Sequence, residues 1–294
     1  MKNQGFNTIL GLREGPSWDL ALKDGWVENT NLFKIEEACD KGTIIHYLLS
    51  DAGQIQQFPK IKNYLTPNKS LYFSHGFGII YKDLTHIEPP KDIDIFMIAP
   101  KGPGIEVRRH FLNEKPINAS WAVHQDYSGK AIEKCLSVGF AIGCENLFQT
   151  TFKNEVYSDL TGERSILMGL LQGAFKAQYD VLREKGHSPI EAYNETIEEG
   201  LKYLYPLVLE NGMDWMFENC STTAQRGALD WAPRYYDILK PEIENCYNSV
   251  ETGIEAQKSI DSNSDPNYRE YLKIELDEIK NQEMWKVKKI LETI

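Results

Sequence analysis

Residues 94–99, Asp94-Ile95-Phe96-Met97-Ile98-Ala99, form a short run of mostly apolar residues that is followed at once by Pro100 and Lys101. A run of this length, rich in β-branched and aromatic side chains, predicts a buried strand. Comparable runs lie at Phe6 to Leu12, Thr43 to Leu49, Ser70 to Ser74 and Ala119 to His124. Helix-like segments separate them, around Trp18 to Lys23, Ile35 to Asp40, Ala52 to Tyr64, Ile105 to Asn113 and Lys130 to Ile142. This alternation predicts a doubly wound α/β domain with a parallel sheet over residues 1–150.

The strand pattern stops at about Asn154, and long helix-like segments follow it. These segments are interrupted by Gly186, the Tyr205-Pro206 step, Gly212, Gly227 and the polar stretch Ser259 to Pro266. Glycine and proline at such intervals are typical of helix ends. We therefore expect an all-α second domain over residues 151–294.

Composition and charge limit the partners and the compartment of the protein. The 294 residues carry 43 acidic against 32 basic side chains and a formal charge of −11, which disfavours a nucleic-acid partner. The sequence contains no run of 18 apolar residues and no recognisable leader, so we expect no membrane segment and a cytoplasmic location. Five cysteines without a CxxC pair indicate free thiols in a reducing compartment and disfavour zinc: Cys39, Cys135, Cys144, Cys220 and Cys246.

Three acidic residues recur at every fourth position early in the helical half. Glu155, Asp159 and Glu163 would project from one face of a helix, where like charges repel one another. A cation from outside the helix would relieve that repulsion, and Mg²⁺ is a hard ion that takes carboxylate oxygens. Acidic residues at this spacing are also common on solvated helices, so the spacing by itself leaves both interpretations open.

A second acidic group lies at residues 187–199. Ser188 and Glu191 form a capping box with Pro189 at the first helical position, so Glu191 is interpreted as structural. Glu198 has Lys202 four residues later and is interpreted as half of a surface ion pair. Glu195 and Glu199, one turn apart, have no such local explanation. If their helix faced the helix of Asp159 and Glu163, paired carboxylates would converge as a metal site requires.

Seven motifs, taken in order, resemble those of the ketol-acid reductoisomerase family. They are Leu71-Tyr72-Phe73-Ser74-His75-Gly76-Phe77, Ala99-Pro100-Lys101-Gly102-Pro103-Gly104 with Val107-Arg108-Arg109, Val123-His124-Gln125-Asp126, Thr150-Thr151-Phe152, Ser158-Asp159-Leu160-Thr161-Gly162-Glu163-Arg164, Ala192-Tyr193-Asn194-Glu195 and Cys220-Ser221-Thr222-Thr223-Ala224. The resemblance runs from about Phe6 to the end of the sequence. The single helical domain resembles that of the short form of the family, which implies a knotted helical fold and a homodimer or higher homo-oligomer whose helical domains interlock.

The resemblance implies a reaction and a metal site. An acetohydroxy acid, 2-acetolactate or 2-aceto-2-hydroxybutyrate, undergoes alkyl migration and is then reduced by NADPH to the 2,3-dihydroxy acid of valine and isoleucine biosynthesis. Asp159 would bridge two Mg²⁺ ions, Glu163 would bind one of them and Glu195 the other. Glu199 would bind at the same site and transfer protons next to the substrate oxygen, Ser221 would hydrogen-bond the substrate, and Glu155 would support the metal ligands.

The resemblance also assigns residues of the α/β half to the cofactor and to catalysis. His75 and Lys101 match positions at the mouth of the cofactor cleft, although a lone histidine after a strand is otherwise interpreted as structural and a lysine between Pro and Gly as a loop charge. Arg13 and Ser17 match the positions that bind the 2′-phosphate of NADPH. The next cofactor-contacting loop is matched by Ser50, Asp51 and Gln54.

One departure from the family concerns the glycine-rich nucleotide loop. A dinucleotide fold opens with a strand, a GxGxxG-like loop and a helix, and this sequence contains no such segment. We therefore expect an incomplete Rossmann-like sheet, explained by a truncated product, by a partner chain that completes it, or by the loss of reduction. Two alternatives to the complete enzyme are a non-catalytic remnant that oligomerises with a complete partner and a Mg²⁺-dependent isomerase without reduction.

Overall fold

The computed structural model describes residues 1–291, so the last three residues of the predicted helical domain lie outside the described residues. The chain divides into two compact units: Met1–Ser158 with Ala256–Ile260, and Asp159–Glu255 with Asp261–Ile294. Two helices, α8 (Phe152–Arg164) and α14 (Ile254–Ser264), contribute residues to both units.

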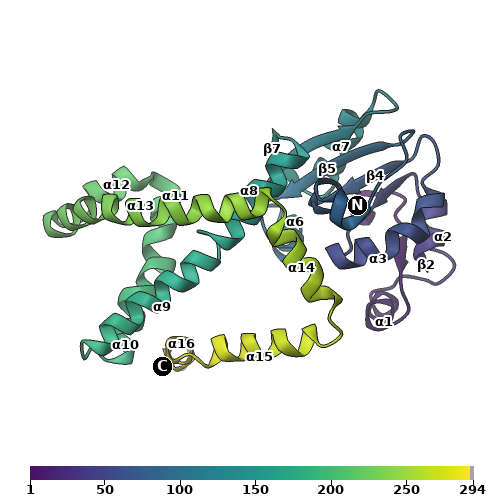
Figure 1. The fold of residues 1–294 in the computed structure, drawn as a ribbon. Coiled ribbons are helices and arrows are strands. Elements are labelled where there is room, and N and C mark those ends of the chain that lie inside the picture. Colours follow the sequence, from purple (N-terminus) through teal and green to yellow (C-terminus); the bar gives the residue numbers. More distant parts are fainter. Residues whose placement is uncertain (292–294) are drawn as a thin grey trace. The chain divides into compact units, whose positions relative to one another are not determined.

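The first unit alternates strands and helices (Figure 1). Its strands are β1 (Leu10–Leu12), β2 (Leu32–Lys34), β3 (Ile44–His46), β4 (Ser70–Phe73), β5 (Asp94–Pro100), β6 (Ile117–Gln125) and β7 (Cys144–Gln149). Its helices, besides parts of α8 and α14, are η1 (Lys2–Gln4), α1 (Pro16–Lys23), α2 (Ile35–Lys41), α3 (Asp51–Ile61), η2 (Lys62–Tyr64), α4 (Phe77–Ile80), α5 (Lys82–Thr85), α6 (Gly104–Leu112) and α7 (Ala131–Ala141). The predicted α/β class is confirmed, and all five predicted strands occur.

The pairing of the strands differs from the prediction in two respects. The main sheet has the order β3-β4-β5-β6-β7 and is mixed, because β6 runs antiparallel to β5, whereas the sequence predicted a parallel sheet. The first predicted strand, β1, pairs in parallel with β2 in a separate two-stranded sheet, with Leu10 opposite Leu32. The parallel direction predicted for β6 is wrong, and the separate pairing of β1 with β2 was not predicted, because periodicity identifies a strand but does not specify its neighbour or its direction.

The two faces of the main sheet are covered by different helices, as a doubly wound fold requires. Successive side chains of a strand point to opposite faces. On β4, Leu71 packs in one buried cluster with Phe58 and Ile61 of α3, whereas Tyr72 packs in another with Val138 of α7. Burial on both faces explains why the strands have continuous apolar runs and not an alternating pattern.

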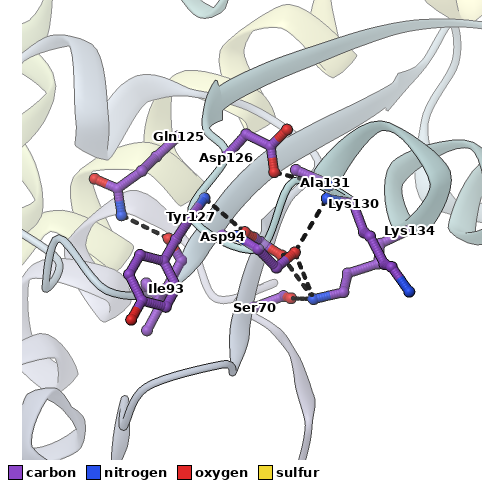
Figure 2. A network of polar contacts seen from close by, with 10 residues as sticks. Ser70, Ile93, Asp94, Gln125, Asp126, Tyr127, Lys130, Ala131 and Lys134 are labelled. Carbon is purple, nitrogen blue, oxygen red and sulfur yellow. Dashed lines mark hydrogen bonds and ion pairs between the residues drawn. The ribbon is translucent and has the colours of Figure 1, made fainter.

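A buried ion pair fastens α7 and the loop before it to the start of β5 (Figure 2). The side chain of Asp94 is 1% exposed, and its Oδ2 lies 2.6 Å from the ammonium of Lys134. The same carboxylate accepts hydrogen bonds from the backbone amides of Tyr127 and Ser128, each at 2.9 Å, and from the Ser128 hydroxyl at 2.7 Å. Lys134 also donates to the Ser70 hydroxyl at 3.2 Å. This cluster thereby ties together three segments that are separate in sequence.

The second unit contains helices only among its described residues. They are α9 (Gly169–Glu184), α10 (Pro189–Tyr193), the π-helical stretches η3 (Asn194–Glu198) and η4 (Gly200–Leu204), α11 (Tyr205–Asn211), α12 (Met213–Glu218), α13 (Thr222–Glu251), α15 (Tyr268–Asn281) and α16 (Glu283–Leu291), with parts of α8 and α14. A buried cluster joins α9, α10, η3 and α16 around Tyr179, Tyr193 and Met284. The predicted helical second half is confirmed. Within residues 1–291, no helix combines the length and the apolar character needed to cross a membrane.

Candidate functional site

Several of the predicted site residues of the first unit follow the carboxyl ends of its strands. Ser50 and Asp51 come shortly after β3, His75 follows β4, and Lys101 follows β5 directly. In open α/β sheets the carboxyl ends of parallel strands form the edge where ligands bind. Since β3, β4 and β5 are mutually parallel and adjacent, the fold brings these side chains to one edge of the sheet.

Lys101 forms an ion pair with Glu155 at this edge. The Lys101 Nζ lies 2.5 Å from the Glu155 Oε1, and the two side chains are 36% and 4% exposed. The other carboxylate oxygen, Oε2, accepts a hydrogen bond from the hydroxyl of Ser120 on β6. Sequence reasoning identified Lys101 and Glu155 but missed Ser120, because no spacing in the sequence connects a strand serine with a helix 35 residues later.

His75 lies in the tightly packed turn between β4 and α4. Its ring stacks on Phe77 with 6.4 Å between centroids. The next residue, Gly76, has no room for a side chain, since a Cβ there would lie 2.7 Å from the Phe152 ring. His75 is thus held by a backbone that approaches α8 closely, and it keeps partial exposure toward the sheet edge.

Burial raises the pKa of the Asp51 carboxyl, and the nearby His75 opposes that shift only in part. A carboxyl group of this kind holds a proton more readily than an ordinary aspartate. Asp51 lies in the first turn of α3, and Ser50 caps that helix by accepting a hydrogen bond from the Gly53 amide at 3.3 Å. These residues therefore combine a structural role with a place at the sheet edge.

The Gln54 side chain points into the protein. A residue that contacts a cofactor is expected to have an exposed side chain instead. Gln54 is 5% exposed, and its amide nitrogen donates to the carbonyls of Tyr47 at 3.3 Å and Leu49 at 3.0 Å. Its side-chain oxygen has no hydrogen-bond partner among the described residues. Gln54 thus shapes the loop after β3, and its direct contact with a cofactor stays a prediction.

Arg13 and Ser17 flank the start of α1, and both are exposed. Among the described residues, the Arg13 guanidinium donates one hydrogen bond, to the side-chain oxygen of Gln56 at 3.2 Å. A guanidinium carries five N–H donors, so four remain after this contact. The position and the donor chemistry suit an anionic ligand.

The predicted metal ligands all belong to the second unit. Asp159 and Glu163 are half-buried on α8, and Glu163 lies 3.8 Å from Arg164. Glu195 and Glu199 are exposed, the first within η3 and the second between η3 and η4. Four carboxylates offer the oxygen ligands that Mg²⁺ prefers, so the donor chemistry fits a hard cation. In the part of the chain that the structure describes, however, no three acidic, histidine or cysteine residues gather closely enough to hold a metal ion.

Two local interpretations of the second acidic group are confirmed. The Ser188 hydroxyl accepts from the Glu191 amide at 3.3 Å while the Glu191 carboxylate accepts from the Ser188 amide at 2.8 Å, which is a complete capping box. Glu198 pairs with Lys202 at 3.0 Å. The π-helical conformation of residues 194–198 and 200–204 was not predicted, and such segments are frequent at functional sites.

Ser221 begins the longest helix and caps it. Its hydroxyl oxygen accepts a hydrogen bond from the Ala224 amide at 3.2 Å, and the side chain is exposed. A capping serine accepts through an oxygen lone pair, so its own proton can still be donated to a ligand. The cap fixes the hydroxyl in place without using its donor.

Comparisons with known proteins give the same family over both units. The family profile described as the acetohydroxy acid isomeroreductase NADPH-binding domain matches residues 1–147, and that of the ketol-acid reductoisomerase C-terminal domain matches residues 152–294. A mitochondrial ketol-acid reductoisomerase of Neurospora crassa is 52% identical over 295 residues, covering 100% of this chain and 73% of that protein.

Two further relatives carry the names of NAD-dependent forms. A ketol-acid reductoisomerase (NAD(+)) of Desulfosudis oleivorans is 56% identical over 286 residues, covering 97% of this chain and 81% of that protein. The solved structure of an NADH-preferring ketol-acid reductoisomerase from an uncultured archaeon superimposes with a TM-score of 0.86 at 31% identity, covering 100% of this chain and 88% of that one. The relatives thus agree on the family, whereas the N-terminal profile names NADPH and these two relatives name NAD or NADH.

Proposed function

This chain belongs to the ketol-acid reductoisomerase family, and from that premise we propose that it converts 2-acetolactate or 2-aceto-2-hydroxybutyrate to the 2,3-dihydroxy acid in valine and isoleucine biosynthesis. The observation that carries the proposal is the match of two family profiles, over residues 1–147 and 152–294. Every acidic residue that the family resemblance assigns to the metal site is present in this sequence. The expectation of a non-catalytic remnant finds no support among the relatives.

The metal-binding part of the proposal rests on four carboxylates that would bind the ions and on Glu155, which would support them from the same helix, α8. Asp159, Glu163, Glu195 and Glu199 would hold two Mg²⁺ ions, which when bound supply Lewis acidity to polarise the substrate carbonyl. Glu199 would accept and return a proton at a substrate oxygen, and the donor of Ser221 would orient the substrate.

Lys101 adds a positively charged side chain to the proposed active site. Its ammonium is held by the buried Glu155 carboxylate, so its position is fixed before substrate arrives. A fixed cation can stabilise negative charge that develops on a substrate oxygen without reorganising. His75 would complete the polar edge beside the nicotinamide.

The cofactor part of the proposal is NADPH, since the donors of Arg13 suit a 2′-phosphate. Ser17 would add a hydroxyl donor, and Ser50, Asp51 and Gln54 would shape the next loop. The profile matching residues 1–147 is that of an NADPH-binding domain, which supports this choice, although the named relatives include NAD-dependent forms. The single helical profile supports the short form of the family.

We further propose that two copies of this chain associate through their helical units. Helix α13 has 30 residues, of which only Val250 is buried. Its exposed large apolar side chains include Leu229, Trp231, Tyr235, Tyr236, Ile238 and Tyr247. Apolar area on this scale is costly in water and is typical of interfaces. Light scattering on the purified chain tests this point: a homodimer or larger is expected, and a monomer at micromolar concentration contradicts it.

The metal requirement tests the reaction most simply. Removing Mg²⁺ with EDTA is expected to abolish 2-acetolactate-dependent NADPH oxidation, and adding Mg²⁺ back is expected to restore it. Asp159→Asn is expected to lose turnover, whereas the matched variant Asp180→Asn on α9 removes a surface carboxylate paired with Lys176 and is expected to retain it. Equal turnover in both variants would contradict the role of Asp159.

A further inference from the structure

Two clusters of the same chemical makeup lie at the two ends of β5. Each consists of a buried carboxylate, a lysine and a buried serine. The first, at the start of the strand, contains Asp94, Lys134 and Ser70 and is called the Asp94 cluster; its lysine donates to the hydroxyls of Ser70 and Ser128. The second, beyond the end of the strand, contains Glu155, Lys101 and Ser120. Only the second lies at the sheet edge where ligands bind.

The residues opposite Ser120 on the two neighbouring strands are apolar. Ser120 is fully buried on β6, where it is paired with Ala99 of β5 and with Phe148 of β7. A hydroxyl buried in such surroundings is unfavourable unless it forms a hydrogen bond. Its bond to the Glu155 Oε2 meets that need. The buried hydroxyl and the buried carboxylate therefore satisfy each other.

Glu155 in turn fixes the position of Lys101. A carboxylate is planar, so a hydrogen bond to Oε2 restrains its rotation and places Oε1 for the ammonium, 2.5 Å away. Among the described residues, the Glu155 Oε1 is the hydrogen-bond acceptor of the Lys101 ammonium. The Lys101 Nζ lies 5.8 Å from the centroid of the Phe148 ring. A lysine side chain has a flexible four-carbon stem, so its ammonium samples many positions without such a contact.

We propose that Ser120 is a positioning residue that acts through Glu155 to hold the Lys101 ammonium in one place at the sheet edge. The effect on catalysis rests on the function proposed above. Ser120 donates to a carboxylate and is 0% exposed, so its hydroxyl acts on Glu155 and not directly on a ligand. The consequence for the reaction is preorganisation: the cation is in place before negative charge develops on substrate. Loss of the hydroxyl leaves a buried carboxylate oxygen unsatisfied and releases the rotation of Glu155.

The test compares Ser120→Ala with Ser70→Ala, which removes the corresponding serine of the Asp94 cluster. The first readout is the rate at which a small acylating reagent modifies the Lys101 amine, measured by mass spectrometry in the full chain without substrate. Loss of one hydrogen bond to a charged group predicts a roughly 3- to 10-fold faster acylation of Lys101 in Ser120→Ala. Ser70→Ala is expected to leave the Lys101 rate unchanged. Lys134 acylation serves as the internal reference for Ser120→Ala alone, because Lys134 donates to the hydroxyl that Ser70→Ala removes.

The second readout is steady-state turnover of an acetohydroxy acid. Ser120→Ala is expected to lower kcat by about 10-fold with less than about 2-fold change in KM, because the cation acts in the transition state and not in ground-state binding. Ser70→Ala is expected to keep wild-type kcat. If Ser120→Ala fails to fold, Ser120→Cys keeps the volume with a weaker donor and is expected to give an intermediate effect.

The outcomes separate this inference from the proposed function. A Lys101 acylation rate that is the same in wild type, Ser120→Ala and Ser120→Cys overturns the positioning role, whatever the activity. Faster acylation with an unchanged kcat also overturns it, since the ammonium would then be loose without consequence. An inactive wild-type chain contradicts the proposed function, and in that case the acylation rates alone support or overturn the positioning of Lys101.

Discussion

Replacing Asp94 by asparagine tests how the first unit is held together. The substitution keeps the shape of the side chain and removes its charge. One amide oxygen can still accept from the backbone amides of Tyr127 and Ser128, but the nitrogen that replaces Oδ2 cannot accept from Lys134 or from the Ser128 hydroxyl (Figure 2). The contact with the Lys134 ammonium therefore becomes repulsive, and the hydrogen bond from the Ser128 hydroxyl is lost.

The expected magnitude follows from these contacts. Removing one partner of a buried ion pair lowers the free energy of unfolding by about 3–5 kcal/mol, because the remaining charge is left uncompensated. The Lys134 side chain is 27% exposed and keeps the Ser70 hydroxyl, so water and that hydroxyl solvate part of its charge. We therefore expect Asp94→Asn to lower the free energy of unfolding by about 3 kcal/mol at pH 7.

The pH dependence of this effect has a defined sign. Burial raises the pKa of Asp94, but hydrogen bonds from Lys134 and Ser128 outweigh it, so the pKa is lowered overall. A carboxyl whose pKa is lower in the folded state stabilises the fold above its unfolded pKa of about 3.9 and loses that contribution as the pH falls through the folded value. The difference between wild type and Asp94→Asn is expected to be largest near neutral pH and to shrink below about pH 4.

Urea denaturation followed by tryptophan fluorescence measures the difference. A cycle with Lys134→Met and the double variant isolates the coupling between the two residues, which is expected to exceed about 1.5 kcal/mol. The same unfolding midpoint for wild type and Asp94→Asn at pH 7, or a coupling near zero, would refute the role assigned to this pair.

Three other substitutions test local features of the chain. Ser188→Ala is expected to lower the unfolding midpoint of the helical unit more than Ser188→Gly does, because alanine is the poorer helix cap, and equal midpoints in a thermal melt would contradict the capping box. Arg164→Met leaves the partly buried Glu255 without the guanidinium that lies 3.1 Å away, so we expect a loss of about 2 kcal/mol in urea denaturation; a loss below about 0.5 kcal/mol would mean that the pair is only a surface contact. Arg13→Leu is expected to raise the KM for NADPH by about 10-fold and that for NADH by less than about 2-fold, and equal changes for both cofactors would argue against 2′-phosphate binding.

Features that depend on neighbouring residues were predictable from the sequence. The capping box of Ser188 and Glu191 and the pair of Glu198 with Lys202 were both predicted and are both confirmed, since each depends on residues three or four positions apart. The five helices predicted in the α/β half also occur within one or two residues of their expected bounds, apart from the 3₁₀ turn that ends the third.

Features that depend on tertiary structure were not predictable in this way. Strand β7 has one buried residue, Cys144, and so lacks both the apolar run and the alternation that identify a strand. Strand β2 contains only two apolar residues, Leu32 and Phe33, and α2 begins directly after it, so the sequence shows no separate apolar run there. The antiparallel direction of β6 and the contact of Ser120 with Glu155 depend on how the chain returns to the sheet, and no local pattern records that path.

We propose that this chain reduces an acetohydroxy acid with NADPH at a Mg²⁺-dependent site. The most direct measurement is calorimetric binding of NADPH to the purified chain with Mg²⁺ present, followed by 2-acetolactate-dependent oxidation of the bound cofactor. We expect saturable binding, and turnover that requires both Mg²⁺ and substrate. A folded chain that binds no NADPH and gives no substrate-dependent oxidation would contradict it.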